Sequence, residues 1–465
     1  MVNNKANANN APRSESNNSN SKINHNKSYK KISFWTAVAV SLGAIIGSGI
    51  FVLSGTAIYL AGWSALAAFI LVGILAIILA LEIGELGSIM PNAKGAAYSF
   101  AYEAFGSELG FMTGILYYFS SVTAVSTIAL GFGSYLSSML NISSSIWSIA
   151  FAMILIFILA IINLSGLKKA ANIDKWLVVA KIAALAIFVV FAVLLIFKSG
   201  KFPIQNFTAG HDGAGISAIF ASSVIILFAY SGFQTISSFT SKVDGGPKNA
   251  AKAILMSVIL SMIIYILVVF TMLLLMPPKF YGVSADPISL ALKNISAPSW
   301  LIYIIDIGAL IATVSATLAM LIRSSRLMYQ VSSDKLLPKI ARSFNKQKDV
   351  AVNGTIISAV IGIVMLFAGN IYVIASISMF GILFAYLISS FSLIHFRRLK
   401  IYGEFKMPYY PYLTLIAISL ILLFMFGIPK NVLSVSIISI LLLFIVYYFL
   451  RESKEKKPVR VKLFK

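Results

Sequence analysis

Twelve apolar runs of membrane length fill most of this chain, and they restrict it to one broad architecture. Of its 465 residues, 59% are hydrophobic and only 11% are charged. Because a lipid bilayer offers no water to backbone N–H and C=O groups, runs of this length must satisfy those groups internally, as helices do. We therefore predict an all-α integral membrane protein, embedded in a lipid bilayer by twelve transmembrane helices, with these spans: Ile32–Leu60, Trp63–Ile89, Phe111–Leu136, Ile146–Leu164, Trp176–Phe197, Gly213–Phe239, Ala251–Met276, Trp300–Leu321, Val352–Ala368, Tyr372–Phe396, Tyr412–Phe426 and Val432–Leu450.

The positive charges lie mainly on one side of the predicted bilayer. Of the 37 Lys and Arg residues, five fall on the side opposite to the N-terminus: Lys198, Lys201, Lys279, Lys293 and Lys430. Positively charged loops face the cytoplasm, so we expect both termini to be cytoplasmic and the protein to lie in the plasma membrane. The net charge of +22 is then a topology signal and predicts no nucleic-acid partner.

Both tails are polar, and the chain has neither cysteine nor a cluster of histidines that could hold a metal. Residues 1–31 have too little apolar surface to fold, so we expect a disordered cytoplasmic tail, and residues 451–465 form a basic cytoplasmic tail. The chain has no cysteine, and its histidines (His25, His211 and His395) lie in separate polar segments. This composition predicts no metal site and no bound cofactor.

A glycine cluster interrupts the first span. Gly47, Ser48 and Gly49 lie within it, although each glycine lowers helix stability by about 1 kcal/mol relative to alanine. Non-helical backbone at membrane depth is tolerated where it lines an enclosed cavity, so the cluster predicts a broken helix at a binding site. The alternative interpretation is close helix packing through small residues.

The sixth span carries a second candidate break. Ser231 and Gly232 interrupt the run from Phe228 to Gln234. The two breaks are offset by five spans. Because five is an odd number of membrane crossings, the second unit would be inverted relative to the first, as in transporters with inverted repeats. For Gly232, close packing explains the residue equally well.

Four motifs resemble those of the amino acid-polyamine-organocation transporters. They are Gly47–Phe51 in span one, the residues from Glu85 at the end of span two to Gly106 in the following loop, Phe228–Phe233 in span six, and Ser325–Pro338 after span eight. Together they cover the chain from about Ile32 to His395. In one departure, Gln234 stands where many relatives carry Glu or Asp.

The resemblance implies a five-plus-five inverted repeat of the LeuT type, with broken helices one and six and two additional helices. The first repeat would be residues 32–197, the second residues 213–396, and the additional helices would lie in residues 409–450. It also implies a permease, which is a secondary active transporter of amino acids that works by alternating access.

The same resemblance places the substrate between the broken helices. The half-helix that begins at Ser48 and Gly49 would offer N–H groups and the positive end of its dipole to the α-carboxylate. We expect unpaired carbonyl groups of Ile45, Phe228 and Ser231 to receive the α-ammonium. Phe228 and Tyr230 would pack on the substrate, although aromatic side chains in apolar spans more often serve packing alone. The expected substrate-binding residues are Ile45, Gly47, Ser48, Gly49, Phe228, Ala229, Tyr230, Ser231 and Gly232.

Lys181 is a charged residue within the inner half of span five, where a charge costs roughly 2.5 to 3.5 kcal/mol. It matches a lysine that, in proton-coupled relatives, is thought to take the place of a sodium ion beside the first break. We expect Lys181 to carry a coupling proton, with Ser315 and Thr317 as candidate partners. The alternative is a lysine that donates to carbonyl groups near Gly47 without titrating.

Three carboxyl groups also fall within the spans. Asp306 could neutralise a cationic substrate or face the outer side, and we expect Glu82 and Glu85 to pair with lysines of the inner loops. Spans three, six, eight and ten contain no other carboxylate at mid-depth. This favours a neutral amino acid over a cationic one or a polyamine.

Other function classes fit less well. Without a histidine pair or a glycine-rich phosphate loop, neither an enzyme nor an ATP-driven pump is expected. A channel would build its filter around a symmetric oligomer, whereas this chain carries its pseudo-symmetry internally. We therefore expect a proton-coupled symporter of a neutral amino acid. The alternatives are an amino acid or polyamine exchanger without proton coupling, and a nutrient receptor that binds without transporting.

Overall fold

The computed structural model describes residues 32–199, 215–234 and 243–452, except Asn92, Lys94, Ser143, Val283 and Ala285. The predicted N-terminal tail and residues 453–465 of the predicted C-terminal tail lie outside this part of the chain. Residues 235–242, which include the end of the predicted sixth span, lie outside it as well.

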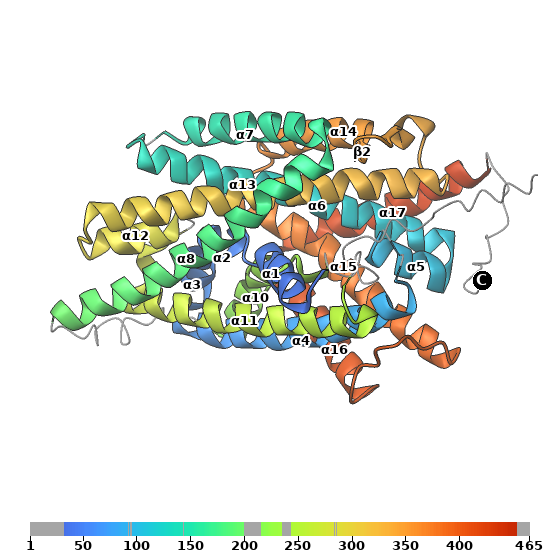
Figure 1. Ribbon diagram of the computed structural model, residues 1–465, viewed down its shortest axis with the longest axis horizontal. Coiled ribbons are helices and arrows are strands. Elements are labelled where there is room, and N and C mark those ends of the chain that lie inside the picture. The colour runs from blue at the N-terminus through green and yellow to red at the C-terminus, as the bar shows by residue number, and fades with distance from the viewer. Residues whose placement is uncertain are drawn as a thin grey trace, which may run out of the picture.

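Helices make up nearly all of the described chain (Figure 1). Within that part, nine helical segments are long and apolar enough to cross a membrane, and three apolar helices are shorter. Every predicted span overlaps one of these helices, so the all-helical class is confirmed, and length alone supports nine of the crossings. The helices of the spans are α1 (Phe34–Ile45), α2 (Ser48–Val52), α3 (Ser54–Ala61), α4 (Ala65–Ile89), α6 (Ser107–Met139), α7 (Ser145–Ser165), α8 (Leu167–Ser199), α10 (Ile216–Tyr230), α11 (Gly246–Leu275), α13 (Ser299–Ser333), α14 (Val352–Met365), α15 (Ile371–Arg398), α16 (Tyr412–Phe426) and α17 (Lys430–Glu452).

Short elements connect these helices. α5 (Ala97–Phe105) and α12 (Pro287–Asn294) lie at opposite ends of the bundle (Figure 1). At the turn between α3 and α4, Gly62 has a φ of 57°, which glycine adopts readily. The remaining short elements are the 3₁₀ turns η1 (Gly62–Ser64), η3 (Pro278–Phe280) and η4 (Lys339–Arg342) and the antiparallel strands β1 (Phe344–Asn345) and β2 (Val350–Ala351).

The centre of the bundle is built around α6. This helix is largely buried and packs on α7, α13 and α15, while α4 packs on α10 and α11. In contrast, α17 presents Leu441, Phe444 and Phe449 outward. Exposed apolar side chains on a helix of this length are expected where it contacts lipid tails.

Glu85 is paired with an arginine, so the predicted pairing with a loop lysine is wrong. Its carboxylate oxygens lie 2.6 Å from Nε and 2.8 Å from Nη2 of Arg397, at the end of α15. The Met407 N–H donates to the same carboxylate at 2.7 Å. A planar guanidinium can bind both oxygens at once, which an ammonium cannot do. The pair ties α4 to α15 and to the segment that precedes α16.

The lysine prediction is also wrong for Glu82. Its Oε2 accepts a hydrogen bond of 2.6 Å from the Ser390 hydroxyl of α15. Glu82 lies one turn before Glu85 on the same helix, and its side chain is fully buried. A long lysine side chain reaching from a loop would have to bring its own charge into this buried space, which is costly.

A further polar contact holds α5 against the end of α13. The Tyr98 hydroxyl donates to Asp334 Oδ2 at 2.6 Å, and Gln330 Nε2 donates to the same oxygen at 3.3 Å. Burial, together with the neighbouring Asp334 carboxylate, raises the pKa of Tyr98. The phenol therefore keeps its proton and remains a donor.

We predict that Arg397→Met lowers the free energy of unfolding by about 3 kcal/mol, because the Glu85 carboxylate would stay buried without its counter-ion. Arg326→Met is the matched control, since Arg326 pairs with Asp349 at 2.7 Å on an exposed surface. Such exposed pairs contribute roughly 0 to 1 kcal/mol. Thermal unfolding of the detergent-solubilised variants measures both effects, and equal shifts of the two midpoints would contradict the prediction.

Candidate functional site

The first span is broken at the predicted glycine cluster. α1 ends at Ile45 and α2 begins at Ser48, so the chain leaves the helical path at Ile46 and Gly47. The Gly47 N–H donates to Ile45 O at 2.7 Å, and no side chain caps α2. The first turn of a helix has no internal acceptor for its N–H groups. Those of α2 therefore point to the break as donors.

In the sixth span, the helix ends at the predicted second break. α10 ends at Tyr230, Ser231 is extended, and Gly232 has a φ of 123°. Residues with a Cβ atom rarely adopt that angle, so glycine is required for the chain to leave the helix in this direction. The course of the chain beyond Gln234 lies outside the described residues.

The two breaks lie against each other. A Cβ atom added to Gly49 would come within 2.3 Å of Ala229 Cα, and one added to Gly232 would come within 2.4 Å of Ala44 O. Both distances are far below van der Waals contact, so the backbones meet where side chains are absent. Chain breakage and close packing, which were alternatives for these glycines, therefore occur together.

Tyr265 of α11 joins the two breaks. Its hydroxyl lies 2.9 Å from Ile45 O and 2.9 Å from Ala229 O. A hydroxyl group has one proton, so the two carbonyls share a single donor. Sequence reasoning missed this residue, although it is the one tyrosine in the long apolar run of α11, where a buried phenol needs an acceptor.

The carbonyl groups of Ile45 and Phe228 are not unpaired, which corrects the predicted ammonium site. Ile45 O accepts hydrogen bonds from Gly47 N–H and from Tyr265. Phe228 O accepts from the N–H of Ser231 at 3.1 Å and from its hydroxyl at 2.7 Å. At each break the chain turns back and supplies a donor of its own, and Ile45 O also shares the single Tyr265 proton with Ala229 O. An ammonium group would compete with these donors for both oxygens.

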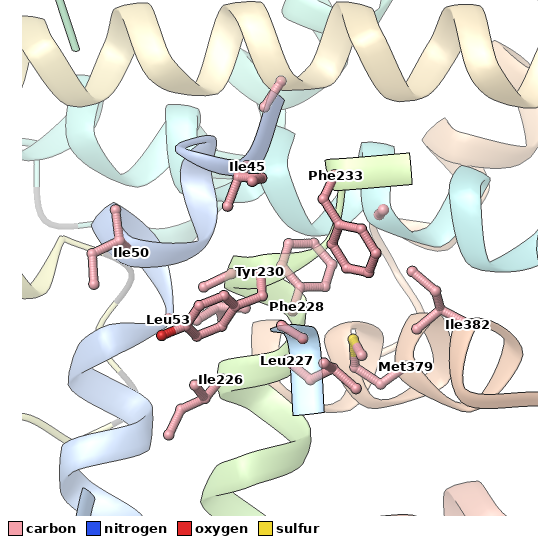
Figure 2. Packing of buried hydrophobic residues seen from close by; sticks show 14 of the residues in the cluster. Ile45, Ile50, Leu53, Ile226, Leu227, Phe228, Tyr230, Phe233, Met379 and Ile382 are labelled. Atoms are coloured by element: carbon pink, nitrogen blue, oxygen red, sulfur yellow. The ribbon is translucent and has the colours of Figure 1, made fainter. Parts of the chain in front are cut away.

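All nine predicted substrate-binding residues are buried. The side chains of Ile45, Phe228 and Tyr230 gather beside the first break (Figure 2). Tyr230 is engaged on both its polar and its apolar side: its hydroxyl lies 3.3 Å from Phe69 O, and its ring packs edge-on against Tyr265 with 5.0 Å between centroids. These contacts are those of a packing residue.

Lys181 contacts α1 close to the first break. It is fully buried on α8, and its ammonium donates to Gly43 O of α1 and lies 3.4 Å from Ser315 Oγ of α13. The structure thus brings the predicted neighbours Lys181 and Ser315 together. Thr317, the other candidate partner, instead donates to Thr313 O at 2.7 Å within its own helix.

A polar network extends from the second break. Gln234 Nε2 donates to Tyr117 OH at 2.5 Å, and Gln234 Oε1 accepts from Tyr386 OH at 2.8 Å. The Arg323 guanidinium lies 5.1 Å from the centre of the Tyr117 ring and donates to Ser121 Oγ at 3.0 Å. The network was not predicted, although a glutamine in an apolar span indicates that several partners must be present.

Asp306 holds α12 against α13. It is buried on α13 and accepts a hydrogen bond from the Ser289 hydroxyl of α12. Neither predicted role, neutralising a cationic substrate or facing the outer side, is needed to explain its position. The bond holds α12 on the bundle.

A hollow rich in hydroxyl groups opens near the same end. Ser134, one of its lining residues, directly precedes Tyr135, whose buried hydroxyl donates at 2.6 Å to Phe51 O of α2. Its lining residues are Ser134, Ser137, Ser138, Asn141, Ile142, Ser144, Ser145, Ser148 and Asp286.

Comparison with known proteins gives a family match over nearly the whole chain. A sequence model described as amino acid permease matches residues 36–463. The methylthioribose transporter of Bacillus subtilis (strain 168) is 27% identical over 86% of this chain and 88% of that protein. The branched-chain amino acid permease BcaP of Lactococcus lactis subsp. cremoris (strain MG1363) is 27% identical over 81% of this chain and 84% of that protein. The cationic amino acid transporter 3, mitochondrial, of Arabidopsis thaliana is 26% identical over 83% of this chain and 65% of that protein.

We predict that Gly49→Ala lowers the free energy of unfolding by roughly 1 to 3 kcal/mol, the cost typical of overpacking, because the added methyl group would meet the backbone of Ala229. Gly215→Ala is the matched control, since nothing lies within 4 Å of its added Cβ atom. Thermal unfolding in detergent measures both variants. If Gly49→Ala were no more destabilising than Gly215→Ala, the breaks would not be in contact.

Proposed function

Because the chain belongs to the amino acid permease family, we propose that it is a secondary active transporter that carries a neutral amino acid together with a proton by alternating access. The family and the relatives named above are transporters, not enzymes. The observation that carries the proposal is the direct contact between two broken helices, with the buried Lys181 behind the first break.

We propose a five-plus-five inverted repeat as the framework of this transport. Residues 32–197 and 213–396 would form the repeats, and α16 and α17 would be the two additional helices. The contact between the first and sixth spans supports this arrangement, because inverted repeats place their discontinuous helices at a common midplane site. Both termini would face the cytoplasm, and the protein would lie in the plasma membrane.

The proposed substrate site lies between the breaks. The α-carboxylate would bind the N–H groups at Ser48 and Gly49, where no side chain caps the helix. The α-ammonium would bind Ser231 O, and also Ile45 O or Phe228 O if their present donors turn away. Gly47, Gly232 and Ala229 would form the backbone of the site. Phe228 and Tyr230 would cover the substrate side chain.

A neutral substrate is supported by the state of the buried carboxylates. Glu85 is neutralised by Arg397, and Asp306 is bonded to Ser289 of an outer helix. Neither carboxylate is positioned at the breaks to receive a cationic side chain. Of the three relatives named above, the branched-chain amino acid permease and the methylthioribose transporter have names that refer to substrates without a cationic side chain, whereas the third is named a cationic amino acid transporter.

Proton coupling is assigned to Lys181. As an ammonium it donates to Gly43 O, one turn before the break, and faces Ser315 Oγ on α13. Loss of its proton would weaken the link between α1 and α13, and so couple protonation to movement of the first broken helix. The alternative is an exchanger in which the same hydrogen bonds serve structure alone.

Uptake into proteoliposomes tests the proposal. A panel of radiolabelled amino acids and methylthioribose would be offered with and without an inward acid gradient of about one pH unit, which can drive about a tenfold accumulation for each proton carried with the substrate. We expect a neutral amino acid to accumulate. Lys181→Ala and Lys181→Arg should abolish the accumulation, because arginine keeps the charge but does not release its proton. Lys198→Ala, at an exposed lysine of the same helix, is the matched control.

Three outcomes would contradict the proposal in different ways. Flux that depends on amino acid inside the vesicle, with no response to the acid gradient, would indicate exchange. Normal accumulation by Lys181→Arg would assign the lysine a structural role. Binding without flux for every compound of the panel would indicate a receptor.

A further inference from the structure

Glu82 is a buried acid that the proposed mechanism does not use. It lies on α4, seven residues before the helix ends at Ile89, and hence roughly 10 Å inside that end. Its side chain has no exposure to solvent. Ionisable groups at such depth are costly and usually functional.

Glu82 faces no counter-ion among the described residues. Arg397 of α15, which packs on α4, is bound by both oxygens of Glu85. α11 also packs on α4, but its Lys248 and Lys252 are exposed. The described part of α10 carries no charged residue, and α16 contributes the hydroxyl of Thr414.

Ser390 provides a partner that suits either protonation state. Its hydroxyl lies 2.6 Å from Glu82 Oε2 and 3.2 Å from Tyr386 O. When Glu82 is ionised, the hydroxyl donates its single proton to the carboxylate. When Glu82 is protonated, the carboxyl can donate to Ser390 Oγ, and the hydroxyl can turn to the Tyr386 carbonyl.

The second oxygen of Glu82 is poorly satisfied. Oε1 is buried and makes no close, well-aligned hydrogen bond among the described residues, and the Thr414 hydroxyl, which lies near the carboxyl group, points to Met407 Sδ at 3.5 Å. A full negative charge shared between one hydrogen-bonded oxygen and one poorly satisfied oxygen is strongly disfavoured in a buried site, so such a group is neutralised by a proton. The packed arrangement thus favours the acid form.

We propose that Glu82 is a proton-binding site of the transport cycle, which holds a proton while α4 and α15 are packed together and releases it when they separate. This inference rests on the proposed function as a transporter. α4 and α15 belong to different proposed repeats, so their separation is a movement that alternating access can produce. Once water reaches the carboxyl group, its O–H bond breaks and the proton passes to water. Repacking requires the carboxylate to take up a proton again.

Glu82→Gln and Glu82→Asp test this site in the full-length protein. The glutamine keeps the shape and one hydrogen bond but cannot exchange a proton, whereas the aspartate can. Glu404→Gln removes an exposed carboxyl group from the segment between α15 and α16 and is the matched control. Infrared difference spectra report the C=O stretch of protonated carboxyl groups, and a pH-sensitive dye inside proteoliposomes counts the protons that enter with each amino acid.

We expect Glu82→Gln to lose a protonated-carboxyl band at neutral pH and to carry one proton fewer per amino acid, while Glu82→Asp and Glu404→Gln keep the coupling. Unchanged proton entry in Glu82→Gln would overturn this site but leave the proposed function intact. The absence of a protonated-carboxyl band in the unmodified protein would also overturn it, even if the glutamine variant did not fold. Lack of uptake by the unmodified protein would overturn both proposals.

Discussion

The need to satisfy backbone polar groups away from water governs this structure. Two apolar helices nevertheless end inside the bundle, at Ile45 and Tyr230, and each end is satisfied locally. Gly47 and Ser231 turn their N–H groups back to preceding carbonyls, and Tyr265 serves both segments with one hydroxyl. Because the two breaks share the Tyr265 donor and touch through glycine, a movement of one break changes the contacts of the other. A ligand that binds there would bias both helices together, as alternating access requires.

Most of the buried charged groups likewise have a partner within hydrogen-bonding reach. Glu85 has the guanidinium of Arg397, Asp306 has the hydroxyl of Ser289, and Lys181 has a backbone carbonyl and a hydroxyl. These contacts link α4 to α15, α13 to α12, and α8 to α1 and α13. In the packed state these pairings link neighbouring helices, and those of Glu85 and Lys181 join helices that lie far apart in the sequence. Glu82 differs, because it has a close hydroxyl partner on one oxygen and no close, well-aligned partner on the other among the described residues.

The sequence predicted features that depend on local composition. Apolar length predicted the helices, and the glycine cluster predicted the break beside Gly47, because both signals lie within one segment. The contact between Lys181 and Ser315 was also anticipated, from depth in two spans. The partner of Glu85 was not, because Arg397 is 312 residues away and only the packed bundle brings the two together. Tyr265 and the Gln234 network were missed for the same reason, and the carbonyls of Ile45 and Phe228 were wrongly expected to lack donors.

We propose that substrate binds between the two breaks, and the absence of native cysteine allows this binding to be measured directly. Ser231→Cys would place a single thiol at the second break with little change of volume, and Ser299→Cys would place one at the exposed start of α13. The rate of labelling by a membrane-permeant thiol reagent would be measured with and without a transported amino acid. We expect the amino acid to slow labelling at position 231 and to leave labelling at position 299 unaffected. Unchanged labelling of Ser231→Cys in a variant that still transports would contradict this proposal.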